Sequence, residues 1–193
     1  MSELKLRIGL TGRMASGKGE VVRILNDYGF HYVSLSDIVH REAAKIQPAI
    51  NRVQMQDLGN RLRAQGGAGI LGRMVRELVE AAEKPLWVID GIRNPAEIVE
   101  LKKMSAFVLL GIQSELPIIM ARLKLRGRST DVVNEEDLRA GLEREWGDNE
   151  PIDGQQVGRC MAMADFVIAN NGSLAELQVG LDEVLKKNGV IHG

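Results

Sequence analysis

Hydrophobic and polar positions change their period several times before residue 50. Residues 4–10 first alternate apolar and charged side chains and then become continuously apolar, a pattern typical of a buried strand that enters a turn. Apolar residues recur at helical spacing over 21–28, which predicts a helix. Residues 31–35 indicate a second strand, and 36–47 a helix with Ser36 as its cap.

The alternation of strands and helices continues to the C-terminus. We predict helices over 52–65, 70–83, 114–126 and 134–146, helix starts at Asn94-Pro95 with Glu97 and at Ser173 with Glu176, and strands over 86–90, 106–112 and 165–170. Strands that alternate with helices predict an α/β fold, in which helices cover both faces of a five-stranded parallel sheet.

Composition narrows the choice of function. The chain has 193 residues, 45% of them hydrophobic, which suffices for one domain with a substantial core. Its formal net charge of −1 argues against nucleic acid or anionic membranes as partners, and no run is long enough to span a bilayer. One cysteine, Cys160, excludes an internal disulfide and fits a reducing cytoplasm. The sequence leaves the oligomeric state open.

The stretch GRMASGKGE, Gly12 to Glu20, lies between the first predicted strand and helix. Gly12, Gly17 and Lys18 match a phosphate-binding loop, and Gly19 stands where that motif has a hydroxyl residue. In this position backbone N–H groups and a helix N-terminus face one phosphate, and the lysine can bridge the β- and γ-phosphates. We predict ATP or GTP binding, with a glycine-rich turn and a solvated lysine as the alternative.

Carboxylates follow two of the predicted strands. Asp90 ends the strand over 86–90, where an acid can hold magnesium or its waters, although it could also only cap the next turn. Asp37 and Arg41 share a helical face after the second strand, where the arginine could bind a substrate phosphate and the aspartate could accept a hydroxyl proton. A surface ion pair explains the same spacing.

An arginine cluster ends the helix over 114–126. Arg122 and Arg126 share a helical face, and Arg128 follows in the loop. These like charges repel each other unless an anion lies between them, so we expect them to face transferring phosphates. An ordinary solvated charged face is the alternative.

These parts, in this order, resemble the nucleoside monophosphate kinase superfamily of P-loop proteins, and most closely the dephospho-coenzyme A kinase-like and adenylate kinase-like members. The resemblance covers nearly the whole chain and implies a three-layer P-loop kinase fold in one domain, residues 1–193. It further implies an acceptor-binding helical segment at about 36–69 and a lid insertion at about 127–160. Adenylate kinases also carry glycine after the loop lysine, and they hold magnesium largely through water and carboxylates.

The resemblance also implies roles for individual residues. Arg93, in DGIRNP, and Arg63, in MQDLGNRLR, become candidates for the acceptor together with Asp37 and Arg41. The donor would lie against Gly12, Arg13, Ala15, Ser16, Gly17, Lys18, Gly19 and Glu20, with the adenine near Asn171 and Gly172. Lys18, Asp37, Arg122, Arg126 and Arg128 would be catalytic, and Asp90 would hold Mg²⁺.

Two positions depart from the related kinases. Dephospho-coenzyme A kinases carry two aspartates after the second strand, and here the first falls on Leu35. Glu20 stands where adenylate kinases have threonine. The sequence predicts an ATP-dependent phosphotransferase that acts on a nucleoside monophosphate, a deoxynucleoside monophosphate or dephospho-coenzyme A. A P-loop regulator with slow ATP hydrolysis and no small-molecule acceptor is the alternative.

Overall fold

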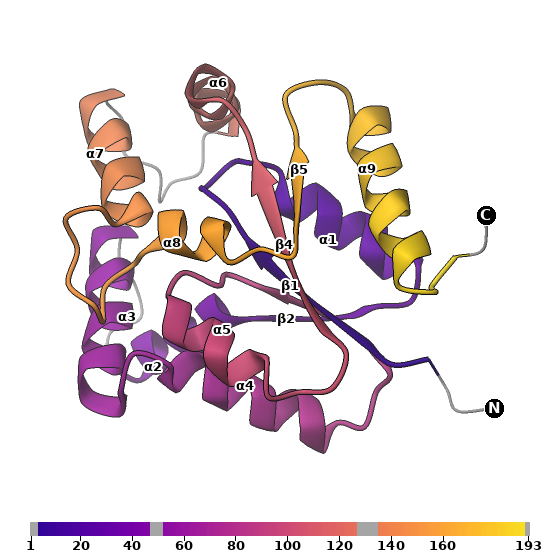
Figure 1. Ribbon diagram of the computed structural model, residues 1–193. Helices are drawn as coiled ribbons and strands as arrows, with labels where there is room; N and C mark the ends of the chain where they lie inside the picture. The colour runs from indigo at the N-terminus through magenta and orange to yellow at the C-terminus, as the bar shows by residue number, and fades with distance from the viewer. Residues whose placement is uncertain (1–3, 47–51, 127–134, 192–193) are drawn as a thin grey trace.

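The computed structural model describes residues 4–46, 52–126 and 135–191. In chain order their elements are β1 (Leu6–Thr11), α1 (Lys18–Asp27), β2 (His31–Ser34), α2 (Leu35–Ile46), α3 (Arg52–Gly66), α4 (Ile70–Ala81), β3 (Leu86–Asp90), α5 (Pro95–Leu101), β4 (Phe107–Gln113), α6 (Leu116–Arg126), α7 (Glu135–Trp146), α8 (Val157–Ala162), β5 (Phe166–Ala169) and α9 (Leu174–Lys187). The strands form one parallel sheet in the order β2-β3-β1-β4-β5 (Figure 1). The predicted fold class is confirmed.

Helices cover both faces of the sheet because successive side chains of its strands point to opposite sides. On one face, Leu110 and Val88 pack with the apolar sides of α1 and α9. On the other, Leu109 and Ile89 pack with side chains of α2, α3, α4, α5 and α8. Each fully buried leucine or isoleucine stabilises the fold by about 1.5–3 kcal/mol, so these two cores hold the three layers together.

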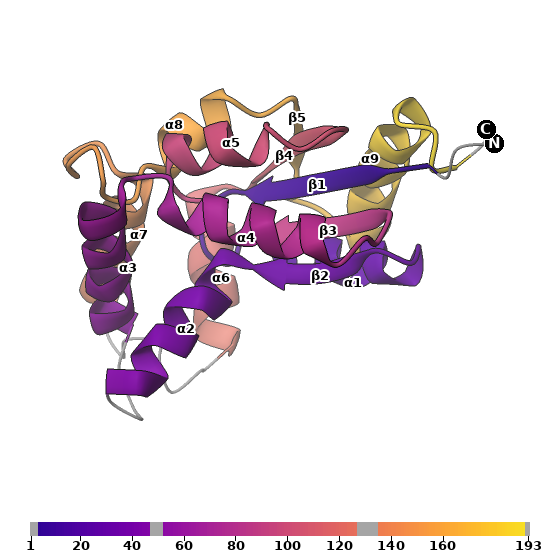
Figure 2. The same ribbon diagram turned by 90° about the horizontal axis from the view of Figure 1, so that it is seen from below.

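The carboxyl ends of the parallel strands meet at one edge of the sheet. Ser34 lies beside Asp90, Thr11 beside Gly111, and Gln113 beside Ala169 in the strand register. Figure 2 shows α2, α3 and α7 gathered at this edge, and both chain ends at the opposite edge. The loops after the strands therefore converge on one region, the usual place of ligand sites in such sheets.

Two predicted helix starts are confirmed, and a third is shifted. Asn94 and Ser173 each form a capping box with a glutamate three residues on. Helix α2, however, begins at Leu35, and the Oγ of Ser34 accepts the Ser36 N–H at 3.1 Å, so Ser34 caps it instead of Ser36. Such a cap contributes about 1 kcal/mol.

Helix α8 was not predicted from the sequence. Its six residues are too few for a helical period to show, and the polar residues before it suggested a loop. Its buried Cys160 and Val157 attach it beside α5 and α7. The second half of the expected lid insertion is therefore folded onto the body of the protein in this structure.

Candidate functional site

The glycine-rich loop connects β1 to α1 and wraps around the N-terminus of that helix. Gly12 and Gly17 have φ of +138° and +107°, a region that side chains rarely adopt. A Cβ on Gly17 would also collide with the side-chain nitrogen of Asn170. Both glycines are thus required by the backbone path, and the loop geometry agrees with the sequence interpretation.

Lys18 lies folded over the loop. Its Nζ donates to the carbonyl oxygens of Gly12, at 2.7 Å, and Arg13, at 2.9 Å. These bonds hold the ammonium group above the concave side of the loop, where a phosphate would meet it. Gly19, next to it, has no atom within 4 Å of where a Cβ would stand, so packing does not exclude a hydroxyl residue there.

Residues that follow β4 and β5 hold the phosphate loop in place through hydrogen bonds. The Nδ2 of Asn170, a side chain only 6% exposed, donates to the Ser16 carbonyl at 2.8 Å. Arg122 donates from Nη2 to the Asn170 carbonyl and from Nη1 to Ser114 Oγ, both at 3.0 Å. The sequence interpretation assigned no role to Ser114 or Asn170: it counted Asn170 in the strand over 165–170, whereas β5 ends at Ala169 and leaves Asn170 free to support the loop.

A single cavity of about 780 Å³ runs past the loop. At one end it is lined by Asn170, Gly172 and Leu174, and at the other by Tyr32, Ser36, Asp90 and Arg93, with Lys18 and Gly19 between them. Several of the predicted donor residues, the predicted magnesium ligand Asp90 and the predicted acceptor residue Arg93 therefore face one space. Its volume lies within the usual range for small-molecule sites.

Carboxylates surround Tyr32 at the acceptor end. Burial raises the pKa of the Tyr32 phenol, Ser34 counteracts this rise by a hydrogen bond, and the negative charges of Asp90 and Asp37 raise the pKa further. Asp37 and Asp90, which come from different strand ends, thus lie close enough to one side chain to act on it together. The Oδ1 of Asp90 accepts the Gly91 N–H at 2.6 Å.

The remaining predicted site residues lie at several separate places. Arg41 is exposed on α2, and Asn171 accepts the Glu115 N–H at 2.9 Å through Oδ1. Glu20 is about half exposed and pairs with Arg23 at 3.1 Å, while Ala15 lines the cavity. Arg126 is the last residue of α6, and its side chain lies outside the described part of the structure. Arg128 lies outside the described residues altogether.

Arg63 is not available to a substrate, contrary to the sequence interpretation. Its side chain is 3% exposed and forms an ion pair with the fully buried Glu97, with Nη2 and Nε at 2.8 and 2.9 Å from Oε1. The Oε2 of Glu97 accepts the backbone N–H groups of Arg93 and Asn94. Arg63 therefore holds the loop after β3 in place from inside the protein.

Helix α7 contacts the phosphate loop through residues that the sequence did not single out for this role. Glu145, 1% exposed, accepts the Met14 N–H at 2.7 Å. The guanidinium of Arg13 lies 4.2 Å from the centre of the Trp146 ring, a cation–π contact. Trp146, the last residue of α7, thus joins that helix to the phosphate loop.

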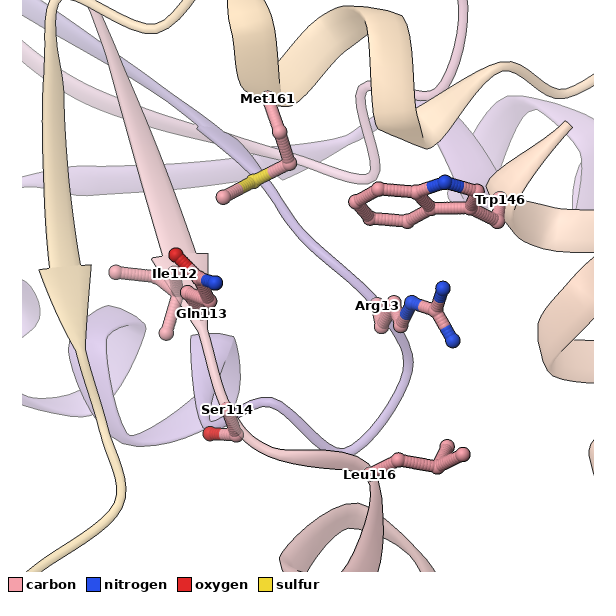
Figure 3. A pocket seen from close by; sticks show the side chains of 7 residues that line it. All are labelled: Arg13, Ile112, Gln113, Ser114, Leu116, Trp146 and Met161. Carbon is pink, nitrogen blue, oxygen red and sulfur yellow. The ribbon is translucent and has the colours of Figure 1, made fainter. Parts of the chain in front are cut away.

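Arg13 and Trp146 also line a second pocket, of about 280 Å³, which is drawn in Figure 3. Arg13 and Trp146 form one wall of this pocket, and Met161 extends into it from α8. Ile112 and Ser114 line the side near β4. Arg13, a predicted donor residue, therefore lines this second pocket and is not among the residues that line the large cavity.

A divalent metal ion would find few protein ligands here. Among the described residues, no group of three or more His, Cys, Asp and Glu side chains could hold one. Two described carboxylates line the cavity: Glu20, which pairs with Arg23, and Asp90, one oxygen of which accepts the Gly91 N–H. This fits Mg²⁺, which usually keeps several waters and binds one or two carboxylates and substrate phosphates.

The chain matches known proteins over most of its length. The family described as an AAA domain matches residues 11–139. A UPF0200 protein of Methanoculleus marisnigri is 32% identical over 185 residues, which cover 94% of this chain and 96% of the relative. The chain therefore belongs to the UPF0200 family. A UPF0200 protein of Sulfurisphaera tokodaii is 29% identical, with 97% of this chain and 99% of that protein covered.

Solved structures confirm the P-loop kinase-like fold. The structure of TT1252 from Thermus thermophilus has a TM-score of 0.64 and 21% identity, with 99% of this chain and all of that one covered. Shikimate kinase from Aquifex aeolicus has a TM-score of 0.55 and 14% identity, with 97% of this chain and all of that one covered. No helix of the described residues has the length and apolar character needed to cross a membrane.

Proposed function

We propose that this protein transfers the γ-phosphate of ATP to a small nucleotide acceptor. The observation that carries the proposal is the cavity in which the phosphate loop and Lys18 lie next to Asp90 and Arg93. Phosphoryl transfer needs positioning and charge neutralisation more than covalent chemistry, and this arrangement offers both.

The two ends of the cavity suit the two substrates. Asn170, Gly172 and Leu174 lie where the base and ribose of the donor would bind, and the loop N–H groups and Lys18 would take its phosphates. Asp90 would hold Mg²⁺ through its waters, and the ion would neutralise charge on the donor phosphates. Arg93, Tyr32 and Ser36 would contact the acceptor. Asp37 lies near enough to Tyr32 to raise its pKa, and the exposed Arg41 follows four residues later on α2.

In the transfer step an acceptor oxygen attacks the γ-phosphorus, and the bond from that phosphorus to the β–γ bridging oxygen breaks, so that ADP leaves. A hydroxyl acceptor must also lose its proton, for which Asp37 is the candidate base, while a phosphate acceptor needs no base. Arg122 would act mainly by keeping the loop in shape, since it donates hydrogen bonds to the loop and its neighbours. Residues 127–160, including Arg128, would form a lid over the site.

One observation favours a second candidate, the nucleotide-driven regulator. Leu35 occupies the position of the missing first aspartate, and this first residue of α2 is 1% exposed in the hydrophobic core. That position therefore supplies no carboxylate to activate a hydroxyl. Such a protein would hydrolyse ATP slowly and act through a protein partner.

The test is ADP release from MgATP, with and without each common ribo- and deoxyribonucleoside monophosphate and dephospho-coenzyme A. We expect one acceptor to stimulate release strongly, and the Lys18→Ala variant to lose at least about a hundredfold of that rate while it keeps the wild-type unfolding temperature. Slow release that no acceptor changes would support the regulator. An unchanged rate in Lys18→Ala would refute the assignment of the loop.

A further inference from the structure

Glu145 stands where the helical pattern calls for an apolar residue. Leu138 and Leu142 form the buried side of α7 and pack against α6, and position 145 continues the same side one turn later. A carboxylate that is 1% exposed lies there instead. A buried charge of this kind is costly unless partners stabilise it, so its contacts indicate its role.

The contacts of Glu145 join the donor and acceptor halves of the site. Its Oε2 accepts the Met14 N–H of the phosphate loop at 2.7 Å. Its Oε1 makes no hydrogen bond and lies 3.6 Å from Nη1 of Arg93, which also donates to Gln155 Oε1 at 3.4 Å. Met14 and Arg93 both line the large cavity, so the carboxylate lies directly behind its wall.

The transferred phosphoryl group must pass between the donor loop and the acceptor. Because Met14 belongs to the first and Arg93 to the second, a group that touches both lies beside that passage. The carboxylate repels a terminal phosphate there, and it also draws the guanidinium of Arg93 towards α7. A buried charge is screened little by solvent, so both effects extend into the cavity.

Building on the proposed function, we propose that Glu145 is a positioning residue. It fixes the orientation of Arg93 and the first half of the phosphate loop, and it weakens the ground-state binding of the terminal phosphate of ATP. ADP lacks that phosphate, so its binding is affected little. Arg93, held by Glu145 through one nitrogen, keeps its other N–H groups for the phosphoryl group in transit.

The two members of the pair should therefore act in opposite directions on ATP. Glu145→Gln keeps an oxygen for the Met14 N–H, removes the charge and releases Arg93, and each of the last two changes favours the terminal phosphate. Arg93→Met removes the attracting charge and leaves the repelling one. A residue that only maintained the fold would shift the affinities for ATP and ADP together.

The experiment measures binding of MgATP and MgADP by calorimetry, so it does not depend on an acceptor. We expect the Kd of MgATP to fall about tenfold in Glu145→Gln and to rise about tenfold in Arg93→Met, with MgADP changed less than about twofold in both. Glu143→Gln is the matched control, because it removes the charge of an exposed glutamate on the same helix; it should leave both affinities as in the wild type. In the presence of an active acceptor, Glu145→Gln should also lower kcat, because Arg93 is no longer held.

The outcomes separate the two proposals. A wild-type protein that binds no MgATP refutes the proposed function, and the role of Glu145 with it. Wild-type binding with an unchanged Kd of MgATP in Glu145→Gln, or with equal changes for MgATP and MgADP, refutes only the role of Glu145. If Glu145→Gln does not fold, the opposite-sign expectation for Arg93→Met still decides: a Kd of MgATP within about twofold of wild type overturns the proposal.

Discussion

Replacing Arg63 with methionine would break its buried ion pair with Glu97 and should destabilise the protein strongly. The sequence suggested that Arg63 binds the acceptor, whereas the structure encloses it, 3% exposed, against a fully buried carboxylate. Arg63→Met removes the guanidinium and keeps an apolar stem of similar length. Glu97 then keeps only the backbone N–H groups of Arg93 and Asn94 as partners.

The expected cost is large because the change leaves one charge of the pair unpaired inside the protein. Breaking a buried pair in this way typically costs about 3–5 kcal/mol in the free energy of unfolding. For a domain of this length, each kcal/mol lowers the unfolding temperature by about 2–4 °C. Arg63→Met should therefore unfold about 6–20 °C below the wild type.

Urea denaturation and thermal unfolding measure this cost, and two further variants interpret it. Arg61→Met changes an exposed arginine on the same helix and should stay within about 0.5 kcal/mol of wild type. Arg63→Met combined with Glu97→Gln removes both charges and keeps the side-chain oxygen that caps α5. The double variant should be more stable than Arg63→Met alone, which would show that the unpaired charge, and not lost packing, causes most of the damage.

A stable Arg63→Met protein that binds its acceptor poorly would refute the purely structural role of Arg63. If Arg63→Met unfolds within about 1 kcal/mol of wild type and the KM for the acceptor rises tenfold or more, Arg63 reaches the substrate as the sequence suggested. Wild-type stability with wild-type kinetics would instead show that the buried pair contributes nothing net.

The remaining predictions concern Asp37 and Cys160. Asp37→Asn should slow transfer to a hydroxyl acceptor about 10²–10⁴-fold and to a phosphate acceptor less than about tenfold, because only the hydroxyl needs a base; initial rates with both acceptor classes check this, and equal losses would exclude that role. Burial raises the pKa of the Cys160 thiol, so a thiol reagent at pH 8 should label it only after unfolding, and labelling of the native protein would contradict its burial. Since the native state resists ionisation of this thiol, the free energy of unfolding should fall as pH rises above about 8.5, where the unfolded thiol ionises, and a Cys160→Ala variant should lack this component.

Local patterns in the sequence were enough to predict the sheet and the phosphate loop. Each strand and most helices follow from hydrophobic period, and the capping residues of α5 and α9 from side chains within four positions of one another. The loop is equally local, because Gly12, Gly17 and Lys18 act through the backbone between one strand and the next helix. Hydrophobic period, helix capping and the glycine-rich loop each depend on residues only a few positions apart, so a single stretch of sequence reveals them.

Only the tertiary structure decided what the charged side chains do. Arg63 and Glu97 are 34 residues apart, and Met14 and Glu145 are 131 apart, so no local pattern connects them. Whether an arginine faces a cavity or a buried carboxylate depends on which helices pack together, and the charge itself is the same in both cases. The sequence therefore determined where phosphates could bind, and long-range packing determined which residues are left to meet them.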